Sequence, residues 1–295
     1  MTKTGSKWVS GILASLFCLN ILAWIAVYDL SRVQLLEITF FDVGEGDSIL
    51  ISPPIFQGIL KNRLQILIDG SPEGDIAEKI ARGMPFFDKK IELVILTHPD
   101  KDHIGGLFEV LERFKVECVL MPKIDGIKEE KEILISFEKL LKEKNVKILT
   151  AREGQKLSFS DKSSFLIFWP PPNLISKDTN DFSIVTKFSF GQIDFLFTGD
   201  APKKVEYQLL AKNFDIQSEV LKIAHHGSRF STSKYFLEKV SPQVAVISVG
   251  ENSYGHPAQE VLDLISKYGI KLFRTDRIGD IKIFSDGKGY EIKLK

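Results

Sequence analysis

Two histidines and two aspartates lie close together in the chain, at His98, Asp100, Asp102 and His103. They follow an apolar run at residues 93–97, which has the composition of a strand buried on both faces. Imidazole nitrogens and carboxylate oxygens suit a borderline divalent ion such as zinc or manganese, and four such groups are enough to share between two ions. The pattern therefore predicts a metal site at the end of a strand. The alternative interpretation is a charged turn in which Asp102 caps a helix.

The spacing of these residues resembles the signature of the metallo-β-lactamase superfamily, in the variant in which Asp100 takes the place of the second histidine. With Gly105 and Gly106 behind it, the variant is similar to the hydrolase domain of the ComEC family of competence (DNA-uptake) proteins. Further segments match that family in the same order along the chain, at residues 40–47, 66–70, 180–183, 195–200, 223–228 and 252–257. The resemblance covers residues 35–295 and implies an αββα sandwich, with the metal site at one edge of two facing sheets.

The rest of the sequence predicts one α/β domain at residues 31–295, since no linker rich in glycine, serine or proline divides it. Strand-like apolar runs lie at residues 36–41, 48–52, 64–68, 93–97, 116–121, 165–169, 184–190, 193–198, 220–224, 244–249, 271–275, 281–284 and 290–294. Helical periods lie at residues 104–114, 129–144, 203–211, 233–240 and 257–268. This mixture fits any large α/β protein, so the specific sandwich rests on the family resemblance.

The N-terminal part of the chain is a separate segment. Residues 8–28 carry no charge, and as a helix they would be about 30 Å long, which is enough to cross a bilayer core. Lys3 and Lys7 precede this run and Asp29 follows it. We therefore expect residues 1–30 to be a single-pass anchor in the cell membrane, with a cytoplasmic N-terminus and an extracellular catalytic domain. The alternative is a cleaved signal peptide, although no Ala-x-Ala-like exit follows the apolar run.

The family resemblance implies further metal ligands at the ends of other strand-like runs. Asp200 matches the carboxylate that bridges two metals, and His225 matches the last histidine ligand. His226 points the other way if the strand persists, so it is predicted to orient a ligand or to contact substrate. The other interpretation of Asp200 is that it caps the helix that begins at Pro202. The predicted ligand set is His98, Asp100, Asp102, His103, Asp200 and His225.

The number and kind of metal follow from one departure from the superfamily pattern. A histidine is normally expected between the first cluster and Asp200, and none of the five histidines lies there. Asn180 stands in that interval, as a weak oxygen ligand or a group that binds substrate. One or two divalent ions are expected, and the oxygen-rich position at Asp100 favours manganese over zinc. The alternative is a mononuclear site formed by Asp102, His103, Asp200 and His225.

Two residues are predicted to act directly in hydrolysis. Asp102 would hold or deprotonate an attacking water that the metals ionise near neutral pH. His256 would protonate a leaving oxygen or bind a phosphate, and its structural alternative is a helix-entry residue packed by Pro257. Asp69 is expected to orient a ligand, with a solvent-facing turn as the alternative. The full set expected to orient ligands or contact substrate is Asp42, Asp47, Asp69, Asn180, Ser183, His226, Ser228 and Tyr254.

Three functional classes follow. The first, which the ComEC resemblance implies, is a metal-dependent phosphodiesterase or deoxyribonuclease that uses a metal-bound hydroxide on DNA outside the membrane. Any transport would then need a separate membrane channel subunit, since one spanning segment forms no pore. The second is a metallohydrolase of a small extracellular or cell-envelope ester, and the third is a non-catalytic, metal-stabilised subunit of a membrane assembly. A β-lactamase is disfavoured because Asp100 does not match the zinc sites of those enzymes.

The charge balance supports the second class. The chain has 39 basic and 39 acidic side chains, and Lys3 and Lys7 are the only charged residues before Asp29, so the domain carries a slight acidic excess. A domain that grips long nucleic acid electrostatically usually has a basic excess.

Overall fold

The computed structural model describes residues 3–31, 35–57, 60–72, 74–84, 88–124 and 131–294. The chain divides into two units by its internal contacts. One unit is Met1–Gln34 with Phe56–Lys61, and the other is Leu35–Ile55 with Asn62–Lys295. Every predicted site residue belongs to the second unit.

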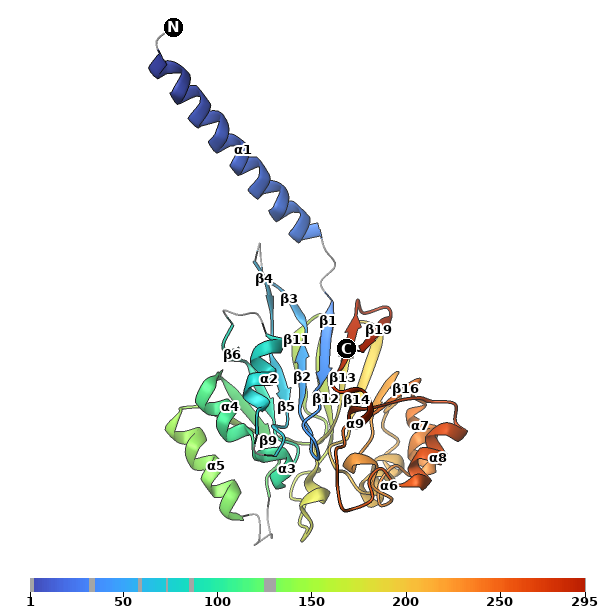
Figure 1. Cartoon of the computed structure of the whole chain (residues 1–295). Coiled ribbons are helices and arrows are strands. Elements are labelled where there is room, and N and C mark those ends of the chain that lie inside the picture. Colours follow the sequence, from blue (N-terminus) through green and yellow to red (C-terminus); the bar gives the residue numbers. More distant parts are fainter. Residues whose placement is uncertain are drawn as a thin grey trace. The chain divides into compact units, whose positions relative to one another are not determined.

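The first unit contains the helix α1, which spans Lys3–Ser31 (Figure 1). Its sequence has no proline and is rich in leucine, isoleucine and alanine, so nothing interrupts the ladder of hydrogen bonds. A helix is therefore present where the sequence predicts one. Among the helices in the described part of the chain, none is both long enough and apolar enough to cross a membrane.

The second unit is built from two mixed sheets that pack face to face. Within the described residues, the first sheet has the strand order β10-β9-β7-β5-β2-β1-β18-β19 and the second has the order β11-β12-β13-β14-β15-β16-β17. The strands of the first sheet are β1 (Leu36–Phe40), β2 (Ile49–Ser52), β5 (Ile66–Ile68), β7 (Leu93–Ile95), β9 (Cys118–Met121), β10 (Lys147–Thr150), β18 (Ile281–Ser285) and β19 (Tyr290–Leu294). Those of the second are β11 (Lys156–Ser160), β12 (Ser163–Trp169), β13 (Val185–Phe190), β14 (Ile193–Phe197), β15 (Val220–Lys222), β16 (Val244–Ile247) and β17 (Lys271–Arg274). Two short pairs are β3 (Pro54–Gln57) with β4 (Leu60–Arg63), and β6 (Lys90–Ile91) with β8 (Lys115–Val116).

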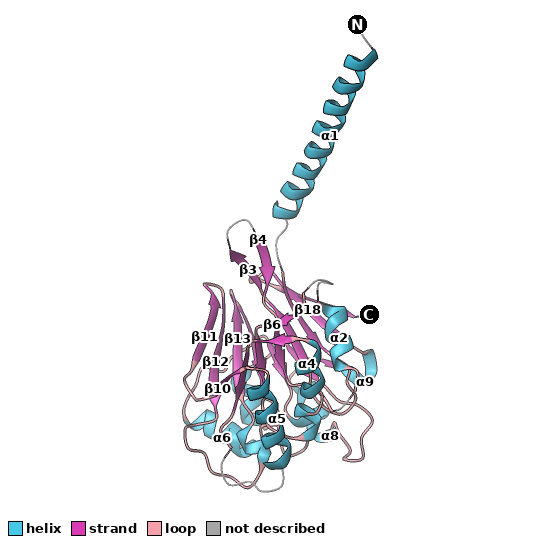
Figure 2. Cartoon of the chain, turned by 90° about the vertical axis from the view of Figure 1, so that its left-hand side faces the viewer, coloured by secondary structure: helices cyan, strands magenta, loops and turns pink. Residues whose placement is uncertain are grey.

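Helices cover the outer faces of both sheets. Figures 1 and 2 show α2, α4 and α5 against the first sheet, and Figure 1 shows α6, α7 and α8 on the side of the second. The helices of this unit are α2 (Ile76–Gly83), α3 (Lys101–Ile104), α4 (Leu107–Arg113), α5 (Lys131–Glu143), α6 (Lys203–Ala211), α7 (Lys234–Val240), α8 (Gln259–Lys267) and α9 (Thr275–Ile278), with 3-10 turns η1 (Thr179–Phe182) and η2 (His225–Gly227).

Side chains alternate along each central strand between two apolar cores. In β7, Leu93 and Ile95 join the core between the sheets, where they meet residues of the second sheet such as Phe188 and Phe195. Val94 points the other way, into the core beneath α2, α4 and α5. A strand buried on both faces needs apolar side chains on both sides, which explains why residues 93–97 form an apolar run without polar/apolar alternation. The αββα sandwich predicted from the family resemblance is confirmed.

The parallel strands of each sheet bring their carboxyl ends to one edge. In the first sheet β5 pairs with β7, and β7 with β9, in parallel. In the second, β14, β15 and β16 are parallel neighbours. Parallel neighbours end on the same side, so the loops that follow β5, β7, β14 and β15 are gathered together. These loops begin at Asp69, Leu96, Thr198 and Ile223, and they carry most of the predicted ligands.

The helix predicted at residues 104–114 is divided into α3 and α4 at its double glycine. A Cβ atom added to Gly106 would lie 2.0 Å from the carbonyl oxygen of Gly70, so only glycine lets this turn pack onto the loop that follows β5. The alternative interpretation of Asp102 as the cap of a helix is wrong. Asp102 lies inside α3, and the N-cap of that helix is Asp100. The start predicted for the last long helix is also two residues early, because α8 begins at Gln259.

Candidate metal centre

The gathered loops line a cleft of about 560 Å³. Seven predicted site residues lie in its lining, and three further residues there were not predicted, namely Glu45, Pro72 and Lys101. The complete lining is Glu45, Pro72, Asp100, Lys101, Asp102, Asp200, His225, His226, Tyr254 and His256.

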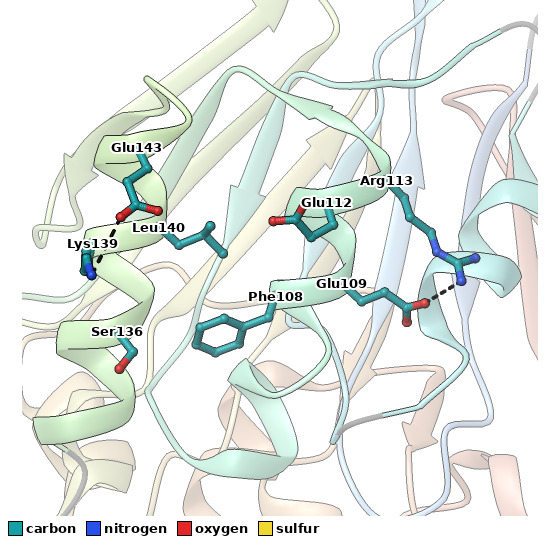
Figure 3. A pocket seen from close by; sticks show the side chains of 8 residues that line it. All are labelled: Phe108, Glu109, Glu112, Arg113, Ser136, Lys139, Leu140 and Glu143. Atoms are coloured by element: carbon teal, nitrogen blue, oxygen red, sulfur yellow. Dashed lines mark ion pairs between the residues drawn. The ribbon is translucent and has the colours of Figure 1, made fainter.

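A second groove lies between α4 and α5, and Figure 3 shows its side chains. Its charges are largely paired within each helix, Arg113 with Glu109 at 2.8 Å and Lys139 with Glu143 at 3.8 Å. No histidine, aspartate or cysteine lines it, so none of the predicted site residues belongs to it. Its lining residues are Phe108, Glu109, Glu112, Arg113, Ser136, Lys139, Leu140 and Glu143.

Four side chains in the cleft place one ligand-type atom each around a common point: Asp102, His103, Asp200 and His226. Nε2 of His103 lies 3.5 Å from Oδ2 of Asp200 and 3.6 Å from Oδ2 of Asp102. Nε2 of His226 lies 3.3 Å from Oδ2 of Asp102 and 3.6 Å from Oδ2 of Asp200. A tetrahedral ion with bonds of about 2.0–2.2 Å holds its ligand atoms about 3.3–3.6 Å apart. The four separations therefore fit one bound divalent ion.

Both histidine rings are oriented by a second hydrogen bond on the opposite nitrogen. Nδ1 of His103 lies 2.8 Å from Oδ2 of Asp69, and Nδ1 of His226 lies 2.9 Å from the carbonyl oxygen of Ser248. Protons on these Nδ1 atoms leave each Nε2 free to bind a metal. Asp69 is fully buried, so the alternative of a solvent-facing turn at this residue is wrong.

His98 and Asp100 stand beside this centre and suit a second ion. Nε2 of His98 lies 3.6 Å from Oδ2 of Asp100. The Thr97 hydroxyl donates to Asp69 and therefore accepts from Nδ1 of His98 at 3.0 Å, which leaves Nε2 of His98 as an acceptor. Among the described residues, this Nε2 and one oxygen each of Asp100 and Asp200 are buried without a hydrogen-bond partner. Unpaired buried polar atoms are costly, and a cation would satisfy them.

The histidines and aspartates of the centre shift one another's pKa values. Burial opposes protonation of His226, but Asp200, Asp102 and Asp47 outweigh it and raise its pKa to about 9. Burial likewise opposes protonation of His103, and nearby carboxylates raise its pKa well above the usual value. For Asp200, burial is outweighed by the histidines, chiefly His103, which hold its pKa well below its ordinary value. For His98, burial and neighbouring His103 lower the pKa to about 4. Without metal, protons on His103 and His226 neutralise the buried carboxylates.

Metal binding should therefore release protons at pH 7. The raised pKa of His226 means that the metal-free ring is protonated at neutral pH, and an ion must displace that proton. Metal affinity should rise as the pH increases from 7 to about 9. Calorimetric titration of the metal-free chain with zinc, in buffers of different ionisation enthalpy, measures the protons released. Binding without proton release, at an affinity independent of pH, would contradict this arrangement.

The assignment of His225 rather than His226 as the ligand rested on a strand that continues through both residues, and this premise is wrong. Strand β15 ends at Lys222, and both histidines adopt a left-handed φ of 51° in the turn η2. His226 is buried in the four-atom centre. His225 is about one quarter exposed in the cleft, and its Nε2 lies 3.8 Å from Oδ2 of Asp200. The four-atom group therefore contains His226 and not His225, and the assignment of His225 as a metal ligand stays a prediction.

A close approach of two backbones explains this turn. A Cβ atom on Gly227 would lie 2.5 Å from Cβ of Pro257, and Ala258 donates its N–H to the carbonyl oxygen of Gly227. The alternative role of Asp200 is also wrong, because the N-cap of α6 is Pro202. The Asp200 N–H instead donates to the hydroxyl of Ser183 at 3.2 Å. Ser183 thus supports the loop that carries Asp200.

The remaining predicted residues lie outside the lining of the cleft. Oδ1 of Asp42 accepts from the Gly44 N–H, and Oγ of Ser228 accepts from the Phe230 N–H, so both side chains shape loops. Asn180 lies in η1, and its side-chain oxygen is buried without a hydrogen-bond partner among the described residues. Asp47 lies behind the centre, paired with Lys222.

One asparagine holds the loop that carries Tyr254 and His256. The side chain of Asn252 donates to the carbonyl oxygens of Gly250 and His256, each at 2.9 Å. It also accepts from the N–H groups of Tyr254 and His256, at 3.1 and 3.0 Å. The Tyr254 ring stacks on His256, with the ring centres 5.7 Å apart, and remains 74% exposed.

Sequence reasoning missed Glu45, whose Oε1 lies 3.4 Å from Nδ1 of His256. The sequence feature that could have indicated Glu45 is the pair of glycines that flank it. Gly44 and Gly46 both have positive φ, and a Cβ on Gly46 would lie 2.4 Å from the carbonyl oxygen of Asp102. These glycines let the loop turn tightly against the centre, with Glu45 at the cleft.

A buried cluster of histidines and aspartates at one edge of two facing sheets defines a metal-dependent hydrolase of the αββα class. Comparison with known sequences agrees: the profile described as "Metallo-beta-lactamase superfamily" matches residues 65–251. The chain belongs to this superfamily.

The chain is also related to competence proteins. It is 31% identical over 265 residues to ComE operon protein 3 of Bacillus subtilis (strain 168), covering 83% of this chain and 32% of the relative. It is 40% identical over 258 residues to Competence protein ComA of Neisseria gonorrhoeae, covering 85% of this chain and 32% of the relative. The chain thus spans about a third of the length of these relatives.

Among solved structures, a CmlA beta-hydroxylase mutant matches with a TM-score of 0.53 at 14% identity, over 85% of this chain and 54% of that chain. At this identity the likeness concerns the fold alone.

Proposed function

We propose that the chain hydrolyses phosphodiester bonds of DNA, in a role related to competence. The observation that carries the proposal is the four-atom centre at the base of an open cleft, since such a centre can act on a phosphate that enters from solvent. The relationship to competence proteins supports DNA as the polymer.

Different residues of the cleft would have different roles in hydrolysis. When bound, a divalent ion supplies charge that polarises the phosphoryl group and makes a nearby water more acidic. Asp102 is one-third exposed, so its carboxylate can accept a proton from water in the cleft. Glu45 faces Nδ1 of His256, so the other ring nitrogen carries a proton for a leaving oxygen when the ring is in its protonated, imidazolium form. Burial and His225 lower the pKa of His256, which makes that protonated ring a stronger acid.

Binding of DNA in this cleft cannot rest on basic side chains. Four of the residues that line the cleft are acidic, and the lining contains one lysine, Lys101. Tyr254 offers a different contact, because its exposed ring is already supported on one face by His256. Stacking of a nucleic-acid base on an aromatic side chain contributes about 1–3 kcal/mol and requires an unpaired base. We therefore expect single-stranded DNA to be the preferred polymer.

The test compares single-stranded DNA with bis(p-nitrophenyl) phosphate, using the purified chain loaded with manganese or zinc. Tyr254→Ala should raise the KM for DNA by roughly 5- to 160-fold, the equivalent of one lost stacking contact. It should leave hydrolysis of the small diester unchanged. Tyr235→Ala is the matched control, because Tyr235 is also exposed, at 61%, but does not line the cleft. Equal effects of the two variants on DNA would contradict the role of Tyr254.

The second candidate is hydrolysis of a small ester, which the acidic lining favours. Rapid turnover of the small diester with no cleavage of DNA would select it. Membrane attachment, an extracellular catalytic domain and a separate channel subunit stay predictions from the sequence.

A further inference from the structure

A buried ion pair ties the two sheets together directly behind the metal centre. Nζ of Lys222 lies 2.7 Å from Oδ2 of Asp47, and these side chains are 1% and 2% exposed. Nζ also donates to the carbonyl oxygen of Ile223 at 2.9 Å. Lys222 ends β15 in the second sheet, whereas Asp47 lies in the loop between β1 and β2 of the first. A lysine withdrawn from water is tolerated only where such partners compensate it.

Asp47 contacts several segments that carry metal ligands. Its N–H donates to the carbonyl oxygen of Asp102 at 3.4 Å, and its own carbonyl oxygen accepts from the Ser71 N–H at 2.8 Å. Its second carboxylate oxygen lies 3.8 Å from Nδ1 of His226. The adjacent Ser48 hydroxyl donates to the carbonyl oxygen of Asp69 at 3.2 Å. A shift of Asp47 would therefore displace both histidine-bearing sides of the centre.

Asp47, Asp69 and His103 also gather close enough to hold a metal ion. The Lys222 ammonium already pairs with Asp47 on its other side, so a fixed cation stands behind the centre. We propose that the Lys222–Asp47 pair is a positioning device that holds the two halves of the metal centre at ligand distance. One half is Asp102 and His103 beside the first sheet, and the other is Asp200 and His226 beside the second.

Another buried lysine provides a matched control. Lys187 in β13 is 6% exposed, and its Nζ lies 3.3 Å from a carboxylate oxygen of Asp194 and of Asp215. Asp194 belongs to β14, and Asp215 lies between α6 and β15, so this cluster stays on the side of the second sheet. Lys187→Met breaks a buried lysine pair without touching the link between the sheets.

The experiment measures zinc and manganese affinity of the full-length chain, without any substrate, so its outcome is independent of the DNA proposal. Lys222→Met should raise the Kd for metal roughly 10- to 100-fold, the usual effect of losing an outer-shell contact. Lys187→Met should change the Kd by less than about threefold although it also loses a buried lysine.

The double variant Asp47→Asn with Lys222→Met separates positioning from stability. It removes the uncompensated buried charge, so its thermal unfolding temperature should return towards that of the unaltered chain, while its metal affinity should remain low. This variant also carries the test if Lys222→Met alone does not fold. Wild-type metal affinity in the double variant, or an equal loss of affinity in Lys187→Met, would overturn the proposal.

Discussion

Replacing Asp200 or His103 by alanine should reduce hydrolysis by more than about 100-fold and remove most of the bound metal. Each residue supplies one of the four atoms that converge on the centre, with separations of 3.3–3.6 Å between neighbouring ligands. Outer-shell changes already cost about 10- to 100-fold in affinity or activity, so loss of a direct ligand should cost more. Metal content by mass spectrometry and hydrolysis rates measure both effects.

Two controls show whether such losses are local. Asp200→Asn keeps the shape of the side chain and removes its charge, so it should lose metal while the circular dichroism spectrum is unchanged. Asp263→Ala alters an exposed aspartate on α8 and should have no effect on metal or rate. Normal metal content and full activity in Asp200→Ala would contradict the assigned centre.

The second large effect distinguishes two adjacent histidines. His226→Ala should lose metal and activity as severely as His103→Ala, because Nε2 of His226 lies 3.3 Å and 3.6 Å from the carboxylates of Asp102 and Asp200. His225→Ala should retain metal and weaken substrate binding by no more than about tenfold, since His225 lines the cleft outside the four-atom set. Measuring the metal content of both variants by mass spectrometry shows which histidine binds the ion. A loss of metal in His225→Ala alone would restore the assignment made from the sequence.

The position of the centre could be predicted because its residues lie directly after apolar strands. The run that ends at Leu96 and the run that ends at Phe197 are buried on both faces, and polar side chains that follow such runs must lie at the sheet edge. The choice between His225 and His226 could not be predicted, because both lie in a turn that packs through Gly227 against Pro257, a contact distant in the sequence.

Besides the cleft residues Glu45, Pro72 and Lys101, two further features were missed from the sequence. Strands β10 and β11 are edge strands, whose partly exposed residues do not form the apolar runs of the central strands. Lys222 was missed for another reason: lysine is almost never fully buried unless paired, and its partner Asp47 comes from the other sheet. Local patterns contain no signal for such a contact.

The most direct test of the central claim is to remove the metal with a chelator and then titrate manganese or zinc back while phosphodiester hydrolysis is measured. Hydrolysis should vanish with the metal and return in proportion to the ion bound, and His226→Ala should not recover. Equal hydrolysis by the chelated and the reloaded chain would show that the centre formed by Asp102, His103, Asp200 and His226 is not the site of the reaction.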